Sequence, residues 1–532
     1  MITVNQIGYQ TKGKKHATAM GAASYQLFRE DGEKILEGSL QPVPDAGSGA
    51  EAACIDFSEV TGPGNYYFVD DKGEKSCTFP ICDTPYAQAF PDAVRMFYFQ
   101  RCGMELTEEY AGKYAHKACH LGEAVYLDDP SRKRELSGGW HDAGDFGRYV
   151  TAAAVALGHL LYSWQLTPGP HAQELHIPET GNGTPDLLNE CRYELDWMLK
   201  MQDEDGGVHH KATSRGFVGF IMPEEDPEQV VITPVSSLAT ADLAAITALA
   251  ARIYEPYDTA YAESLKRAAL SAAEWLKAHP DFLFHNPEEV KTGTYEDLCD
   301  ADERLWAAAE LYLLTKEEEM IGVMRQILEI RVDMTALGWA DVGGFAALAV
   351  LLADAGVFPE DLSARFRGAL VDEAERLLRV ASESPFELTL RPFEVRWGSN
   401  MVVLTNAMLL AVAHHLTGET RYLDAAGYQV DYIFGRNAMD TSYVTGHGER
   451  AFRDPHNRPT VADGIEAPIP GFVSGGPNAR PCDEAANPRT LAGAAPLKCY
   501  VDNWKSYSTN EITIYWNSPL VFVLAYLTAA GR

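Results

Sequence analysis

The stretch NMVVLTNAMLLAVAHHLTG, residues 400–418, shows most clearly how the larger part of this chain folds. Its apolar residues recur at intervals close to 3.6, which is the repeat of an amphipathic α-helix. Gly418 follows Thr417 at the point where such a helix should stop. We therefore expect an α-helix that begins near Asn400 and ends at Thr417.

The same texture extends from Pro85 to the end of the chain and predicts twelve helices. Their expected starts lie near Phe90, Phe146, Pro185, Thr240, Thr259, Asp302, Lys316, Gly343, Pro359, Asn400, Thr420 and Ser518. Twelve helices in consecutive hairpins suit a toroid of six inner and six outer helices. Periodicity alone does not distinguish that closed barrel from an open helical array.

The first part of the chain is different, because short β-rich runs are separated by glycine and proline turns up to about Cys82. These runs are residues 25–28, 53–57 and 65–69. They predict a small β-sandwich that packs against the rest without chemistry of its own. The expected domains are therefore residues 1–84, an all-β sandwich, and residues 85–532, an all-α domain.

The net charge of the chain limits the classes of molecule that it is expected to bind. The 76 acidic and 44 basic residues among 532 give a net charge of −32, which repels phosphate backbones and anionic membranes. We expect neither nucleic acid nor a membrane as partner, whereas a neutral polysaccharide or a hard cation remains open. Nine cysteines, an odd number, do not predict a disulfide framework. A monomer is expected.

The beginning of the sequence has no basic segment followed by an apolar one, so it shows no secretion signal. This leaves two alternatives: a cytoplasmic enzyme that acts on imported oligosaccharides, or a secreted protein whose signal has been trimmed. Three segments without periodic pattern, residues 104–145, 206–232 and 437–516, interrupt the helices. Such segments inside a compact domain are usually functional.

Two of these segments hold carboxyl groups in a pattern suited to acid–base chemistry. Asp142 and Asp145 lie three residues apart in GGWHDAGD, residues 138–145, ahead of a predicted helix, where both can address one water molecule. On spacing alone, a helix cap is the favoured interpretation. Glu511 lies among tyrosine and tryptophan, where loss of solvation would raise its pKa toward that of a general acid. Ordinary exposure is the alternative for Glu511.

The runs GGWHDAGDFGRY and YSTNEITIYWNSPLV resemble the two signatures of glycoside hydrolase family 9. GNGTPDLLNE, WGSNMVVLTNAMLL and PGFVSGGPN are also similar to the branch that carries an N-terminal immunoglobulin-like domain. The resemblance implies an (α/α)6 barrel and an endoglucanase that hydrolyses internal β-1,4 bonds of glucans with inversion. It makes Asp145 the general base, Asp142 the group that holds the water and Glu511 the general acid. Base and acid would then be roughly 6.5–9.5 Å apart.

A glucan presents apolar ring faces and many hydroxyls, so its binding site needs flat aromatic rings and paired donors and acceptors. By resemblance Trp397 lines the cleft, whereas Trp516, inside an apolar run, is expected to be core. The other candidates for sugar binding are Tyr507, His210, His456 and Arg458. Relatives often have His-His-Arg where this chain has His456-Asn457-Arg458, which leaves one sugar contact open.

Two metal sites are expected, and no organic cofactor. Two thiols and two imidazoles form a tetrahedral zinc set, although spacing alone would equally allow a disulfide or free thiols. The four are Cys102, Cys119, His120 and His141. Family members carry a structural zinc at matching positions, and a metal on His141 would stiffen the loop that presents Asp142. Asp302, Glu303 and Asp341 resemble calcium ligands of relatives, with helix N-terminal charge as the alternative.

Three rival functions remain. Relatives with the same carboxylates release single residues from chain ends as exo-glucosidases or exo-glucosaminidases, and a loop that closes one end of the cleft would favour that action. The stretch of residues 479–496 resembles an insertion of this kind. A glycan-binding protein without activity would lack a catalytic carboxyl, and all three are present. A metal-dependent lyase of similar architecture would not require Asn510-Glu511.

Overall fold

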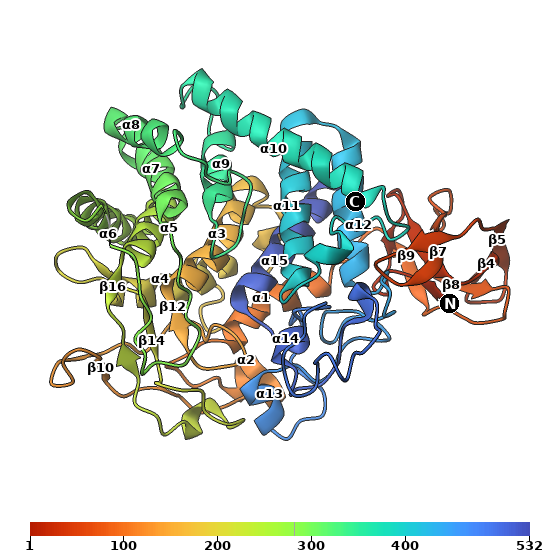
Figure 1. Ribbon diagram of the computed structural model, residues 1–532, viewed down its shortest axis with the longest axis horizontal. Helices are drawn as coiled ribbons and strands as arrows, with labels where there is room; N and C mark the ends of the chain where they lie inside the picture. Colours follow the sequence, from red (N-terminus) through yellow and green to blue (C-terminus); the bar gives the residue numbers. More distant parts are fainter. Residues whose placement is uncertain (281) are drawn as a thin grey trace. The chain divides into compact units, whose positions relative to one another are not determined.

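The computed structural model describes residues 1–280 and 282–532 and divides into two compact units. Unit 1 contains residues 1–96 together with residues 372–532, and unit 2 contains residues 97–371. Figure 1 follows the chain from the red N-terminal strands to the blue C-terminal helices. The N-terminal β-strands and the last helices of the chain therefore belong to the same unit.

The N-terminal strands form two mainly antiparallel sheets. One has the order β1-β3-β7-β6 and the other the order β2-β9-β8-β4-β5. The strands are β1 (Ile2–Thr3), β2 (Tyr9–Gln10), β3 (His16–Met20), β4 (Ser24–Arg29), β5 (Lys34–Ser39), β6 (Val43–Asp45), β7 (Ala50–Asp56), β8 (Gly64–Asp70) and β9 (Phe79–Cys82). The three predicted β-runs fall in β4, β7 and β8, which confirms them.

Side chains from both sheets meet in one apolar core. Phe57 packs edge-on against Tyr9, with ring centroids 5.0 Å apart, and against Phe68 at 5.2 Å. Both arrangements are favoured by the quadrupoles of aromatic rings. Alternate residues of β8 are buried, as expected for a strand with one face on a core. The β-domain is thus a sandwich with a core of its own.

Every predicted long helix is present. They are α1 (Ala89–Phe99), α3 (Val150–Leu166), α4 (Asp186–Lys200), α5 (Ser237–Tyr254), α6 (Thr259–Ala278), α7 (Ala301–Thr315), α8 (Glu318–Ile327), α9 (Gly343–Leu351), α10 (Glu360–Ala381), α11 (Ser399–Thr417), α12 (Thr420–Ile433) and α15 (Ile514–Ala530). Three short helices were not predicted: α2 (Glu108–Ala111), α13 (Arg458–Ala462) and α14 (Tyr507–Asn510).

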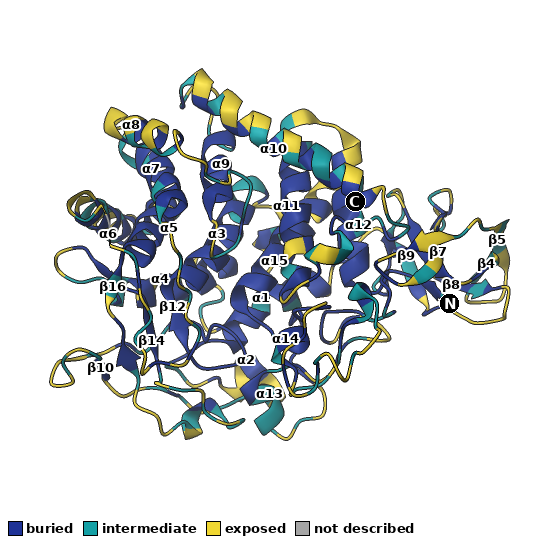
Figure 2. Ribbon diagram, viewed as in Figure 1, coloured by how far each residue is buried: buried dark blue, intermediate teal, exposed yellow. Residues whose placement is uncertain are grey.

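From α3 to α12, burial alternates from one long helix to the next, whereas α1 is buried like α3. The helices α3, α5, α7, α9, α11 and α15 are buried over most of their surface (Figure 2). Those between them have exposed faces: α4, α6, α8, α10 and α12. A helix that is apolar all round lies inside a protein, whereas an amphipathic one covers it. α11 is long and apolar enough to cross a membrane, yet 67% of its apolar window is buried, as in a core helix.

Two predicted helix starts are four residues off, and the last helix, expected near Ser518, begins at Ile514. The helix expected near Phe146 begins at Val150, because Arg148–Tyr149 forms β12 and pairs with β14. Tyr149 is the N-cap residue, so neither Asp142 nor Asp145 caps this helix. The capping alternative for the two aspartates is therefore excluded.

Short strands of unit 2 lie in two of the segments expected to lack pattern, or within four residues of them. They are β10 (Ala124–Tyr126), β11 (Lys133–Arg134), β12 (Arg148–Tyr149), β13 (Val208–His209), β14 (Lys211–Thr213), β15 (Val231–Ile232) and β16 (Val235–Ser236). Five of them form a sheet of order β11-β10-β15-β14-β12. This sheet ends in β12, directly after Asp145.

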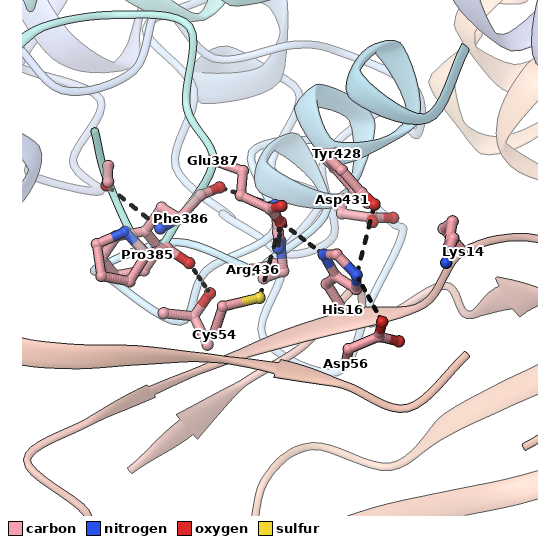
Figure 3. A network of polar contacts seen from close by, with 12 residues as sticks. Lys14, His16, Cys54, Asp56, Pro385, Phe386, Glu387, Tyr428, Asp431 and Arg436 are labelled. Atoms are coloured by element: carbon pink, nitrogen blue, oxygen red, sulfur yellow. Dashed lines mark hydrogen bonds and ion pairs between the residues drawn. The ribbon is translucent and has the colours of Figure 1, made fainter. Parts of the chain in front are cut away.

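Within unit 1, a polar network that includes the exposed Cys54 joins the β-domain to the helical part (Figure 3). Glu387 Oε2 accepts hydrogen bonds from His16 Nδ1 and from Arg436 Nη1, each at 2.7 Å. The ring of His16, on β3, stacks on Tyr428 of α12 with centroids 4.5 Å apart. Burial lowers the pKa of His16, but hydrogen bonds with Cys54 and Glu387 outweigh this effect and raise it to about 9. We call these five residues the clasp.

Candidate functional site

The loop of residues 138–145 is held rigidly from several sides. Gln100 Nε2 donates to the carbonyls of His141 at 3.0 Å and Ala143 at 2.8 Å. Gly139 has φ +74, and a Cβ there would lie 2.7 Å from the ring of Trp197. Only glycine fits this position without strain. The loop therefore presents its two aspartates in one fixed geometry.

Asp142 is buried at 2% exposure. Its Oδ2 accepts a hydrogen bond from Tyr295 Oη at 2.5 Å, and its Oδ1 has no hydrogen-bond partner among the described residues. Burial and the charge of Asp145 raise the pKa of Asp142 well above its usual range, although the bond from Tyr295 lowers it. A buried carboxyl with one free oxygen is suited to hold a water molecule or a sugar hydroxyl.

Asp145 has a different environment. Its Oδ2 accepts hydrogen bonds from the Gly147 amide and from Tyr149 Oη, each at 3.2 Å. Burial and the charges of Asp145 and Asp142 raise the pKa of Tyr149 well above its usual range, so its hydroxyl stays protonated and donates. The two donors hold this carboxylate oxygen in one orientation.

Glu511 lies in unit 1, directly after α14. The segment around it is pinned, because the Gly475 amide donates to its carbonyl at 2.8 Å and the His456 amide donates to the carbonyl of Asn510 at 2.9 Å. Asn510 is fully buried and its Oδ1 accepts from Tyr500 Oη at 2.5 Å. Residues 510–511 thus present the Glu511 carboxyl from a fixed backbone.

An aromatic surface lies beside Glu511. The ring of Trp397 is 5.4 Å from that of Tyr507, and the ring of His456 is 6.0 Å from that of Tyr507. Trp397 is 51% exposed, an unusual state for a tryptophan and a suitable one for stacking on a sugar ring. We call Trp397 and Tyr507 the platform. Trp516 is 5% exposed, which confirms that it is a core residue.

The other predicted sugar contacts have different surroundings. His210 is fully buried, its Nδ1 lies 2.9 Å from Ser236 Oγ, and its Nε2 lies 3.1 Å from the carbonyl of Tyr295. His210 therefore supports the backbone of Tyr295, and its contact with sugar stays a prediction. Arg458 begins α13 and is 5% exposed.

The predicted zinc ligands come together in unit 2. The candidate ligand atoms of Cys102, Cys119, His120 and His141 all lie within 4.8 Å of one another. Cys102 Sγ is 3.6 Å from His120 Nδ1, and Cys119 Sγ is 3.9 Å from His141 Nε2. With Zn–S about 2.3 Å and Zn–N about 2.0–2.1 Å, a tetrahedral site has such edges.

Both cysteines are free thiols, so the disulfide alternative is not realised. His120 Nε2 also lies 3.2 Å from Asp226 Oδ2. A carboxylate on the second nitrogen is the usual partner of a histidine that binds zinc. The donor set, its spacing and this outer partner therefore all fit zinc. Asp226 was not singled out from the sequence.

The predicted calcium ligands belong to a larger acidic group of unit 2. Asp302 Oδ2 accepts from the Val342 amide at 2.7 Å, while Asp341 is exposed. Glu303 and Asp242 are fully buried, and all four of their carboxylate oxygens have no hydrogen-bond partner among the described residues. Burial and the charges of Asp302 and Asp242 raise the pKa of Glu303 well above its usual range. Buried oxygens of this kind fit a hard cation. Asp242 was missed because it lies inside a helix.

Carboxyl groups held by a fixed backbone, on a largely helical scaffold with an exposed aromatic surface, are the features of a glycoside hydrolase. Residues 86–524 match the profile described as Glycosyl hydrolase family 9, and residues 1–76 match that of the Cellulase N-terminal ig-like domain. The chain belongs to glycosyl hydrolase family 9.

Relatives match over nearly the whole chain. A cellodextrinase from Butyrivibrio fibrisolvens is 40% identical and covers 98% of this chain and 99% of its own. Endoglucanase D from Acetivibrio thermocellus is 35% identical, over 98% of this chain and 83% of its own. The solved structure of a single mutant of a thermostable endoglucanase from Alicyclobacillus acidocaldarius superposes with a TM-score of 0.93 at 34% identity, covering 99% of both chains. These matches confirm the predicted fold, an immunoglobulin-like β-sandwich followed by an (α/α)6 barrel.

Proposed function

We propose that this enzyme hydrolyses β-1,4-glucosidic bonds of glucans with inversion at the anomeric carbon. The observation that carries the proposal is the contrast between two neighbouring aspartates. Asp142 is held at one oxygen by Tyr295 and has its other oxygen free, whereas Asp145 receives two donors. Two carboxyls whose environments differ in this way are suited to different roles at one water molecule.

Each carboxyl has one step in the proposed mechanism. Asp145 takes a proton from the attacking water, whose oxygen then forms the new bond to the anomeric carbon. Asp142 fixes that water through its free oxygen. Glu511 donates a proton to the oxygen of the leaving sugar as the old bond breaks. One water is consumed, and attack opposite the leaving group inverts the configuration.

The first candidate substrate is a soluble or mixed-linkage β-glucan cut at internal bonds. Relatives named as endoglucanases, 35% identical, support this mode of action. A second candidate is the hydrolysis of short cellodextrins. It is favoured by the 40% identical relative named as a cellodextrinase, whose length this chain matches almost completely.

We also propose a structural role for two metals. Zinc bound by Cys102, Cys119, His120 and His141 would hold the loop that carries Asp142, without taking part in the reaction. Calcium at Asp302, Glu303 and Asp341, with Asp242 as an added ligand, would neutralise buried carboxylates. Neither metal supplies a proton or a nucleophile in this mechanism.

The test uses carboxymethylcellulose, barley β-glucan and cellotetraose as substrates for the wild type, Glu511→Gln and Asp145→Asn. Loss of an acid or a base should slow hydrolysis about 10²–10⁴-fold. The first products should be α-anomers, followed by NMR. Asp128→Asn, at an exposed loop position, is the control and should keep full activity. Activity that survives both site substitutions, or β-anomers as first products, would refute the mechanism.

A further inference from the structure

The platform ends at one residue. Tyr507 Oη donates to the carbonyl of Cys482 at 3.1 Å, and Cys482 Sγ lies 3.8 Å from Tyr507 Oη. Cys482 is exposed and therefore stands at the outer edge of the tyrosine ring. A glucan that lay along the platform and extended past the hydroxyl end of Tyr507 would meet this residue.

The chain directly after Cys482 is anchored beneath the platform. Asp483 is 8% exposed, and its Oδ2 accepts from Ser506 Oγ at 3.0 Å, from the Ser508 amide at 2.8 Å and from Ser508 Oγ at 2.6 Å. Ser506 and Ser508 flank Tyr507. A buried carboxylate with three donors holds its segment firmly, because hydrogen bonds to charged groups are the strong ones. Cys482 and Tyr507 thus have a fixed relation.

The residues that follow Asp483 are held in place by hydrogen bonds among themselves. Asp483 Oδ1 accepts from the Ala486 amide at 2.6 Å, and the Asn487 side chain accepts from the Arg489 amide at 2.9 Å. The Leu491 amide donates to the carbonyl of Asn487 at 3.0 Å. These are turns closed by local bonds, so the stretch has a defined shape although residues 488–490 are exposed.

The far end of the stretch rests on the β-domain. The Leu497 amide donates to the carbonyl of Gly47 at 2.9 Å, and the Leu497 side chain is 3% exposed. A Cβ on Gly47 would lie 2.8 Å from Leu497 Cδ1. Gly49 has φ +65, and a Cβ there would lie 2.8 Å from Ala495 Cβ. The two glycines let the β-domain approach this closely. Both ends of the stretch are therefore braced.

We propose that residues 480–495 form a barrier at the end of the platform, which favours short chains and chain ends over the interior of a polymer. This proposal rests on the proposed glucan hydrolysis and specifies its substrate. A surface open at both ends accepts a long chain at any position, whereas a rigid obstacle at one end accepts a chain only where it terminates. Asp483 is then a specificity-determining residue that acts through the position of Cys482.

The test compares initial rates on carboxymethylcellulose and on cellotetraose for three variants. In the first, residues 488–493 are replaced by two glycines; the second is Asp483→Asn. The control is Glu484→Gln, in the same stretch, whose carboxylate pairs with Lys505 at the surface. The polymer-to-tetraose rate ratio should rise about tenfold in the first variant and about threefold in the second. It should not change in the control.

An unchanged ratio in a folded variant, with cellotetraose still hydrolysed, would overturn the barrier. If the variant shortened at residues 488–493 does not fold, the polymer-to-tetraose rate ratio of Asp483→Asn tests the proposal. Wild type that hydrolyses neither substrate would instead refute the proposed function, so the two failures are distinct. A second measurement follows alkylation of individual cysteines in Glu511→Gln by mass spectrometry. Cellotetraose should slow alkylation of Cys482 and leave exposed Cys54 unaffected; equal rates at Cys482 with and without the sugar would overturn the proposal.

Discussion

The clasp between the β-domain and the helical part of unit 1 allows a quantitative prediction for Glu387→Gln. Burial opposes ionisation of Glu387, but its bond with His16 and the charge of Arg436 lower its pKa to about 2. The rise in the pKa of His16 from 6.5 to about 9 corresponds to about 3 kcal/mol, which the interactions with Cys54 and with Glu387 share. The substitution also removes the ion-pair partner of the fully buried Arg436, although the charge of Asp431 still acts on it; the loss of such a partner typically costs about 3–5 kcal/mol when no other charge remains.

We therefore expect Glu387→Gln to destabilise unit 1 by about 3 kcal/mol, which for a domain of this size lowers Tm by roughly 6–12 °C. The loss should depend on pH. The folded pKa of His16 is raised, so its contribution is complete below pH 6.5 and is lost as pH rises through about 9. The folded pKa of Glu387 is lowered, so its contribution is complete above pH 4.5 and is lost as pH falls through about 2.

The assay is calorimetric unfolding of wild type and Glu387→Gln at pH 5.5, 7.5 and 9.5. The difference in Tm should be largest at pH 5.5 and smallest at pH 9.5. Glu383→Gln, which removes a surface ion pair with Arg391, is the matched control and should change Tm by at most about 1 °C. A Tm difference for Glu387→Gln that is equally small, or equal at all three pH values, would refute the reasoning.

Three further predictions concern the site in unit 2. Purified protein should contain a single zinc ion per chain by mass spectrometry, and Cys102→Ser should lose it and unfold several degrees earlier; a full-strength zinc signal in this variant would contradict the assignment. Tyr295→Phe removes the bond that lowers the pKa of Asp142, so kcat should fall about 10–100-fold and the acidic limb of its pH profile should move to higher pH; an unchanged limb would show that Tyr295 does not act through Asp142. Calcium at a hundredfold excess over its Kd should stabilise the wild type by about 2.7 kcal/mol, measured by thermal unfolding. Asp242→Asn should reduce this gain, and an equal gain would exclude Asp242 as a ligand.

Local sequence patterns predicted the long helices well, because each is encoded by a periodicity that does not depend on distant residues. The start of α3 was predicted too early. Residues 146–149 read Phe-Gly-Arg-Tyr and directly precede the apolar run, but β12 forms by pairing with β14, more than sixty residues later in the chain. Pairing over such a distance leaves no local signal.

The site was predicted in part, for the same reason. Asp142, Asp145 and Glu511 are proposed from their signatures, whereas Tyr295 lies 153 residues from Asp142 in an unpatterned stretch with φ +49. A positive φ on tyrosine is uncommon, but it is visible only in the structure. His210 was selected as a polar aromatic residue in an irregular segment, which does not reveal that its ring is buried.

The division of the chain also bears on how the protein is made. Unit 2 is continuous, from residue 97 to residue 371, so it can complete its internal contacts while the ribosome is still adding the remainder. Unit 1 combines the first 96 residues with the last 161, and even Arg532 donates a hydrogen bond to the carbonyl of Lys14. The β-sandwich is therefore synthesised long before residues 372–532, which complete its unit. Until those residues have been made, His16 and the glycines of residues 47–49 lack their partners and are accessible to chaperones.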